Sequence, residues 1–154
     1  MHKELPELAR ELKKMKVLVK LDTNGSKPEM IKKLIAEKLI DYIAMDIKAP
    51  FEKYEKITGT KTNISDLKES IKTIIKSGIE HEFRTTAVPG LVSRKDLIEM
   101  AKNIKGAKRL AIQQFSPQLG KLMDKQLESQ KPYSREEMQE MAKECCKHVK
   151  TDAR

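Results

Sequence analysis

Two aspartates come directly after short apolar runs that contain several β-branched residues. Residues 17–21 lead into Asp22, and residues 40–45 lead into Asp46. A run that stops at a carboxylate is typical of a parallel strand, and ligands bind at the carboxyl ends of parallel strands. If the two strands are neighbours, their carboxylates lie within several ångströms of each other. Paired oxygens of this kind suit a cation, an ammonium group or ribose hydroxyls.

The first acid also has a purely structural interpretation. Asp22 could hold a turn through its own side chain, with Asn24 and Gly25 taking up the positive φ angles. In the ligand interpretation, the hydroxyl of Thr23 adds a further oxygen beside the carboxylate. Both interpretations are open for Asp22 alone, and the matching position of Asp46 favours the ligand site.

A lysine follows the second acid at a spacing of two residues. Lys48 therefore points to the same side of its strand as Asp46. A lysine there can form a Schiff base or bind a carboxylate. Because a nearby carboxylate raises a lysine's pKa and opposes Schiff-base chemistry, we favour an electrostatic role. The alternative is a solvated lysine at the rim of the sheet.

The third expected strand carries polar residues that a dry core does not tolerate. Arg84, Thr85 and Thr86 follow one another in it. A buried arginine needs an acidic partner, which Glu82 or Asp46 could provide. A structural ion pair and a contact to a ligand are both compatible with this pattern.

The remaining candidate ligands form no metal motif. His2, His81 and His148 are scattered along the chain without metal-ligand spacing. The only cysteines, Cys145 and Cys146, are adjacent, so we expect no relaxed disulfide between them. This favours a reducing, cytoplasmic setting. Two cysteines are also too few for a thiolate cluster site.

Hydrophobic periodicity predicts helices and strands in alternation. Apolar residues recur every three or four positions in the expected helices 5–15, 28–39, 65–78, 93–106 and 134–145. Pro28 and Ser65 mark two of the starts, and Ser93 with Asp96 and Ser134 with Glu137 are expected to open two others as capping boxes. The expected strands are 17–23, 40–48, 80–88 and 109–115, with longer connections at 50–63 and 116–132. Strands separated by helices predict an α/β fold with a parallel sheet of about four strands and crossover helices. Because the strands are too polar for a sheet covered on both faces, we expect a curved sheet or part of a barrel.

Composition limits the class of protein further. The 154 residues suffice for one domain, and the net charge is +9, from 32 Lys and Arg against 23 Asp and Glu. The lysines are spread over the expected helices and interleaved with Glu, which disfavours nucleic-acid binding. No apolar stretch approaches the roughly 20 residues of a membrane span, and the start does not resemble a signal peptide.

Four strings in a consistent order resemble the radical S-adenosylmethionine activating enzymes. They are residues 21–25 (LDTNG), 40–50 (IDYIAMDIKAP), 83–90 (FRTTAVPG) and 113–115 (QQF). The resemblance covers about residues 5–150. Within this superfamily, the chain is similar to the activating proteins of anaerobic ribonucleotide reductase and of pyruvate formate-lyase.

The resemblance implies a fold, a cofactor and a partner. The family has a six-stranded partial (β/α) barrel, of which residues 1–154 form one carboxyl-terminal portion with the third to sixth strands. The implied partner is a glycyl-radical enzyme, such as anaerobic ribonucleotide reductase or a formate-lyase-like protein. Carried over by position, the residues near S-adenosylmethionine are Asp22, Thr23, Asp46, Lys48, Arg84, Thr86, Gln114 and Ser116. Asp22 and Asp46 also help to hold a monovalent cation.

The chain departs from the family at its iron–sulfur site. The CxxxCxxC string that binds a [4Fe-4S] cluster is missing, as is the Gly-Gly-Glu-like string that binds the cofactor's amino group. We therefore expect a portion that binds the cofactor but does not cleave it, with the missing strands lost, cloned away or supplied in trans. The alternative is a non-catalytic half-barrel module that binds a partner or a nucleoside ligand. Without a neighbour, strand 17–23 has an exposed edge, which predicts self-association.

Overall fold

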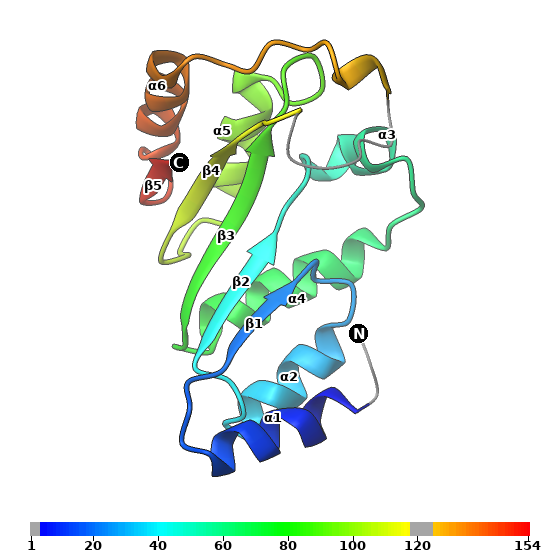
Figure 1. The fold of residues 1–154 in the computed structure, drawn as a ribbon, viewed down its shortest axis with the longest axis vertical. Coiled ribbons are helices and arrows are strands. Elements are labelled where there is room, and N and C mark those ends of the chain that lie inside the picture. The colour runs from blue at the N-terminus through cyan, green and yellow to red at the C-terminus, as the bar shows by residue number, and fades with distance from the viewer. Residues whose placement is uncertain (1–3, 118–124) are drawn as a thin grey trace.

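The structure is a computed structural model that describes residues 4–117 and 125–154. Its strands form one parallel sheet in the order β1-β2-β3-β4-β5. The strands are β1 (Lys20–Thr23), β2 (Tyr42–Asp46), β3 (Glu80–Ala87), β4 (Leu110–Gln114) and β5 (Thr151–Ala153). The sheet twists along the length of the molecule, with β1 at one edge and β5 at the other (Figure 1). The expected α/β fold with a parallel sheet is confirmed.

Helices connect the strands in the expected alternation. The α-helices are α1 (Leu5–Lys14), α2 (Pro28–Ala36), α3 (Tyr54–Thr58), α4 (Ile64–Lys76), α5 (Arg94–Asn103) and α6 (Arg135–Cys145). Two short 3-10 turns, η1 (Phe51–Lys53) and η2 (Lys125–Leu127), lie in the connections. None of the helices in the described ranges combines the length and the apolar character that crossing a membrane requires.

The two faces of the sheet differ sharply in polarity. Strand register places apolar side chains such as Leu21, Ile43 and Phe83 on one face, where they join the helices in a single hydrophobic core. The opposite face carries aligned polar residues, with Asp46 beside Arg84 in the next strand. The polar face expected from the sequence is therefore confirmed, and it accounts for the charged residues within the strands.

Capping residues set where the later helices begin. Ser93 and Asp96 form the expected capping box of α5. Ser134 and Glu137 form the second one, at the start of α6. The helix after the long connection begins earlier than expected. Ser65 was predicted to cap α4, but Asn63 is the cap, because its side chain accepts the Ser65 backbone N–H at 3.1 Å.

Two segments differ from the sequence prediction. The connection 50–63 contains η1 and α3, which ends at Gly59 with φ +65°. The sheet has a fifth strand, β5, beyond the four expected, and it pairs with β4 in the register Leu110↔Thr151. Three residues with half-buried side chains show no alternation that a sequence pattern could detect. Of the loop expected over 116–132, residues 118–124 lie outside the described part.

Candidate functional site

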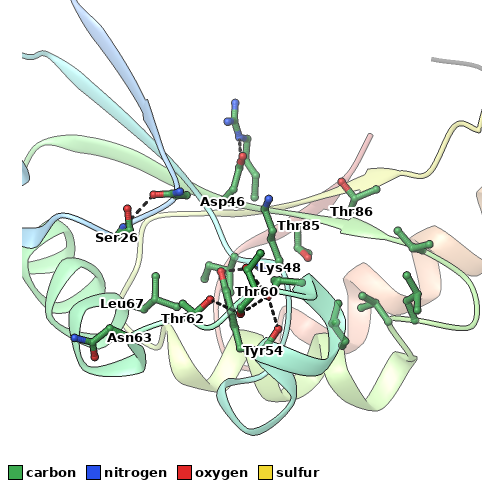
Figure 2. Close-up of a pocket in the computed structure, with 18 of the residues that line it drawn as sticks. Ser26, Asp46, Lys48, Tyr54, Thr60, Thr62, Asn63, Leu67, Thr85 and Thr86 are labelled. Atoms are coloured by element: carbon green, nitrogen blue, oxygen red, sulfur yellow. Dashed lines mark hydrogen bonds and ion pairs between the residues drawn. The ribbon is translucent and has the colours of Figure 1, made fainter. Parts of the chain in front are cut away.

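A cavity of about 660 Å³ lies at the carboxyl ends of the strands. One wall is formed by strand ends and the residues after them, and the other by α3, the loop 59–63 and the first turn of α4 (Figure 2). Both walls are rich in hydroxyl, amide and charged groups, including Asn24, Asp46, Lys48, Thr60, Lys61, Thr62, Asn63, Asp66, Arg84, Thr86 and Gln113. This is the edge at which the sequence placed the ligand site.

Arg84 joins the two aspartates that the sequence singled out. Its Nη1 lies 2.6 Å from Asp22 Oδ1, and its Nε lies 2.8 Å from Asp46 Oδ1. The arginine side chain is only 16% exposed, whereas both carboxylates are about half exposed. Burial lowers the pKa of Arg84, but the hydrogen bond to Asp46 and the charges of Asp46 and Asp22 outweigh this and raise it. The expected proximity of the two acids is confirmed, and a guanidinium connects them.

The turn after β1 is held by residues other than Asp22. Thr23 accepts the Gly25 backbone N–H at 3.1 Å, and Asn24 accepts the Ser26 backbone N–H at 3.1 Å. Asp22 instead pairs with Arg84 and with Lys20. The structural interpretation of Asp22 as the turn-holding residue is therefore wrong. The side chain of Thr23 is buried on the helix side of the sheet, away from the carboxylate pair.

Gly25 permits the close approach of this turn to the core. Its φ is +75°, and a Cβ at this position would lie 2.0 Å from Met45 Cε. Its carbonyl accepts the hydroxyl of the buried Ser70 in α4 at 2.7 Å. The turn that carries Asn24 into the cavity wall is thus fixed against α4.

Lys48 lies in the cavity wall with an exposed side chain. Within residues 4–117 and 125–154, no carboxylate lies within 4.0 Å of its ammonium group. Its backbone N–H donates to the hydroxyl of Tyr54 at 3.3 Å. Tyr54 is buried, and this burial raises its pKa. The tyrosine thus connects α3 to the segment after β2 and leaves the lysine charge available to a ligand.

Of the predicted site residues on β3 and at the end of β4, some line the cavity and others do not. Thr86 lines the cavity and is aligned with Gln113 on β4. Gln114 points to the helix side, where its amide donates to the Tyr133 carbonyl at 2.8 Å. Ser116 is half-buried after the end of β4 and is not among the residues that line the cavity. Of the two glutamines at the end of β4, Gln113 is the one that lines the cavity.

The cysteines and histidines of the described part form no metal site. In residues 4–117 and 125–154, no three His, Cys, Asp or Glu side chains form a group that could hold a metal ion. His81 is buried, with its ring nitrogens near the Ile79 carbonyl and the Lys108 N–H. Burial raises the pKa of Cys145 to about 12, which keeps this thiol protonated. The donor set of this chain therefore does not fit an iron–sulfur cluster, which needs several thiolates.

The wall from α3 to α4 was not predicted to take part in the site. Thr58, Thr60, Lys61 and Thr62 line the cavity opposite the strand ends (Figure 2 labels two of these threonines). Short stretches of alternating Thr and Lys look like an ordinary connection in sequence. The one available signal was its length, because long connections at the carboxyl edge of a parallel sheet often carry binding residues.

Comparison with known proteins gives two similarities in sequence. The family model described as the Radical SAM superfamily matches residues 1–104. A protein of Methanocaldococcus jannaschii, whose name describes it as a candidate glycyl-radical enzyme activating enzyme, is 41% identical over 115 residues. That match covers 72% of this chain and 48% of the relative. The chain thus spans about half the length of the relative.

A solved structure is similar in fold. The crystal structure of a domain of pyruvate-formate lyase-activating enzyme from Bacteroides vulgatus matches with a TM-score of 0.75 and 11% sequence identity. The match covers 97% of this chain and 89% of that domain. At this identity the similarity shows the fold alone, and it agrees with the partial (β/α) barrel expected from the sequence.

Proposed function

Because the chain belongs to the radical SAM superfamily, we propose that its cavity binds S-adenosylmethionine as part of a glycyl-radical enzyme activating protein. The observation that supports this most is the charged group Asp22, Arg84 and Asp46 at the carboxyl ends of the strands. Of these residues, Arg84 and Asp46 line the cavity together with Lys48. S-adenosylmethionine carries a carboxylate, an ammonium group, a sulfonium and ribose hydroxyls. The cavity offers charged groups of both signs together with neutral hydroxyls, which suits this mixture.

Each charged residue can take a separate part of the cofactor. Lys48 has no carboxylate partner in the described ranges, so it is free to bind the cofactor's carboxylate. Asp46 has only one oxygen in its hydrogen bond with Arg84, which leaves the other for an ammonium or ribose hydroxyl. Thr86 and Gln113 lie on the same face of the sheet and supply neutral groups toward the adenosine. The other residues expected near the cofactor, Asp22, Thr23, Gln114 and Ser116, are not among those that line the cavity.

A monovalent cation near Asp22 and Asp46 is part of the proposal. Both carboxylates are about half exposed and so have oxygens that can face a cation from the solvent side. Arg84 already neutralises part of their charge. The cation would therefore share the two acids with the guanidinium.

In this superfamily the cluster supplies the electron for reductive cleavage of the cofactor. The two cysteines of this chain do not fit that cluster, because they are adjacent and Cys145 is buried and protonated. We propose that the cluster thiolates and a glycyl-radical enzyme partner come from outside these 154 residues. On its own, the chain binds the cofactor and does not cleave it. The same donor set also fits the second candidate, a module that binds a nucleoside ligand without chemistry.

Isothermal titration calorimetry tests the binding site. S-adenosylmethionine and S-adenosylhomocysteine are titrated into the wild type, Asp46→Asn and Asp152→Asn. Asp152 is the control because it pairs with Arg109 at the far end of the polar face and does not line the cavity. We expect micromolar binding by the wild type, at least about tenfold weaker binding by Asp46→Asn, and little change for Asp152→Asn. Absence of binding to the wild type, or equal loss in both variants, would contradict the proposed site.

The two candidates differ in the fate of the cofactor once it is bound. The portion of the Methanocaldococcus jannaschii relative that this chain does not match is added with a reconstituted cluster. If the chain is part of an activating protein, the mixture should then release 5′-deoxyadenosine under reducing, anaerobic conditions. A simple binding module should not respond to that addition. Release that depends on both parts supports the activating function, and unchanged cofactor in the mixture supports the module.

A further inference from the structure

A second concave surface lies on the helix layer, apart from the cofactor cavity. It has a volume of about 410 Å³ and is formed by η1, α4 and the end of α5. Three apolar side chains line it, namely the buried Ile71 and the half-buried Phe51 and Ile75. Its other lining residues are Lys68, Lys72, Lys76, Asn103 and Lys105. We refer to this surface as the basic groove.

The lysines of the basic groove form a continuous positive stripe. Lys68, Lys72 and Lys76 are spaced by four residues on α4 and so share one side of the helix. Lys105 belongs to the same groove and follows the end of α5. All four side chains are exposed, and in the described part of the chain no carboxylate lies within 4.0 Å of their ammonium groups. Lys68 contacts the ring of Phe51, with its Nζ 5.0 Å from the ring centroid.

Lys32, which lies near the basic groove, differs from the groove lysines because it has carboxylate partners. Lys32 on α2 pairs with Glu29 at 2.8 Å and also with Glu69 of α4. Among the described residues that line the basic groove there is no acid. Four like charges around an apolar floor leave the folded chain with an uncompensated repulsion, which an acidic partner would relieve.

We propose that the basic groove is a docking site for an acidic amphipathic helix of a partner protein. Phe51, Ile71 and Ile75 form a floor that accepts two or three apolar side chains at helical spacing, and the lysines match Asp or Glu beside them. This site goes beyond the cofactor cavity, which uses the first turn of α4 rather than the lysine stripe.

The shape and chemistry of the groove favour a peptide over other anions. A nucleic-acid backbone would contact the lysines but would leave the apolar floor unfilled. The described lining of the groove also has no arginine that could read bases. A membrane surface would need protruding apolar side chains, whereas Ile71 is buried at the bottom of a concavity. A helix with an apolar stripe and acidic flanks satisfies both features of the groove.

Fluorescence anisotropy tests this with a labelled helical probe peptide. The probe carries Leu at positions i, i+4 and i+7 with Glu beside them, and two control peptides replace either Glu by Gln or Leu by Ser. The protein is the full chain as wild type, as Lys72→Glu/Lys76→Glu, and as Lys143→Glu/Lys147→Glu. The last pair consists of exposed lysines near α6 that also have no carboxylate partner in the described ranges, so it matches the change in net charge.

We expect the wild type to bind the probe at least about tenfold more tightly than either control peptide. The groove variant should lose about tenfold in affinity, and the α6 variant should stay within about twofold of the wild type. Equal losses in the two variants would overturn the proposal, because they would show a response to net charge alone. Failure of the wild type to bind the probe would overturn it as well. So would tighter binding of a DNA duplex or anionic vesicle that Lys72→Glu/Lys76→Glu abolishes.

Discussion

At the scale of single residues, Arg84 decides how the two predicted acids are arranged. The sequence identified Asp22 and Asp46 as a pair and named Asp46 as one partner for the arginine. It could not show that one guanidinium contacts both acids, because this depends on the register of β2 with β3 and on a side-chain conformation. A planar group with several N–H donors can serve two carboxylates in this way.

Substitutions of Arg84 should distinguish the stability that comes from bridging two acids from the stability that comes from a positive charge alone. Arg84→Gln leaves Asp46 without its arginine partner and Asp22 with Lys20 alone. It should lower the free energy of unfolding by about 1 kcal/mol, a modest loss because both acids are about half exposed. Arg84→Lys keeps the charge but loses the fork geometry. Its free energy of unfolding should therefore lie between those of the wild type and Arg84→Gln. Urea unfolding followed by circular dichroism measures both. Equal stability of all three proteins would show that the bridge does not form in solution.

A second prediction at the scale of single residues concerns Gly25 and the close packing of the turn after β1. Gly25→Ala combines a positive φ with a Cβ only 2.0 Å from Met45 Cε, and we expect a loss of about 2–4 kcal/mol. Gly90→Ala is the matched control, because its φ is +82° but no described atom lies within 4 Å of the added carbon. It should cost only about 1 kcal/mol from the backbone. Thermal and urea unfolding compare the two, and similar losses would contradict the close packing of the turn after β1.

At the scale of elements, the start of α5 is tied to the connection after β2. Asp96 accepts hydrogen bonds from the Ser93 hydroxyl at 2.7 Å, the Ser93 N–H at 3.0 Å and the Lys53 ammonium at 2.7 Å. Burial raises the pKa of Asp96, but the bonds from Lys53 and Ser93 outweigh it and lower this pKa overall. One carboxylate thus connects η1 to the start of α5.

The pH dependence of stability tests this carboxylate. Because the folded-state pKa of Asp96 lies below its unfolded value of about 3.9, the charge stabilises the fold above that pH. The contribution is lost as the pH falls through the folded-state pKa. Asp96→Asn should be less stable than the wild type by about 1 kcal/mol near pH 7. The difference should narrow below about pH 4, and a difference that stays constant down to pH 3 would exclude a role for the charge.

Helices and strands could be predicted only where the pattern of apolar or capping residues extended over enough positions. The helices α4, α5 and α6 were recognised from their apolar periodicity, and the capping boxes at Ser93 and Ser134 gave two of their starts. Asn63 was missed as a cap because Ser65 is equally suitable by residue type, and only the backbone conformation distinguishes them. The strand β5 was missed because it is three residues long and depends on pairing with β4.

At the scale of the whole molecule, β1 is an edge strand that among the described strands pairs only with β2. Leu18, two residues before this strand, is 86% exposed, and Val17 and Met15 beside it are also exposed. An edge flanked by exposed apolar residues favours pairing with another chain. Asp22, which belongs to the proposed cofactor site, lies on this same edge strand.

We expect the isolated chain to self-associate through this edge. Multi-angle light scattering should show a mass that rises with protein concentration. Leu18→Lys should shift the population to the monomer, and Leu8→Lys, which removes an exposed leucine from α1 instead, should change it less. A monodisperse monomer of the wild type at high concentration would contradict the prediction.

The candidate site was predictable in its chemistry and only partly in its shape. Asp46, Lys48, Arg84 and Thr86 meet at the strand ends, as the parallel topology requires. The opposite wall, residues 58–63, could not be inferred because its position depends on how α3 packs after β2. Gln113 and Gln114 are adjacent in β4 and so point to opposite faces of the sheet, and of the two it is Gln113 that lines the cavity.

Hydrogen–deuterium exchange with and without S-adenosylmethionine tests the central claim most directly. If the cavity binds the cofactor, backbone protection should increase at residues 46–48, 58–63 and 84–88 and stay unchanged at α6, which lies apart from the cavity. Protection confined to other segments, or no change at saturating ligand, would contradict the assignment of this cavity.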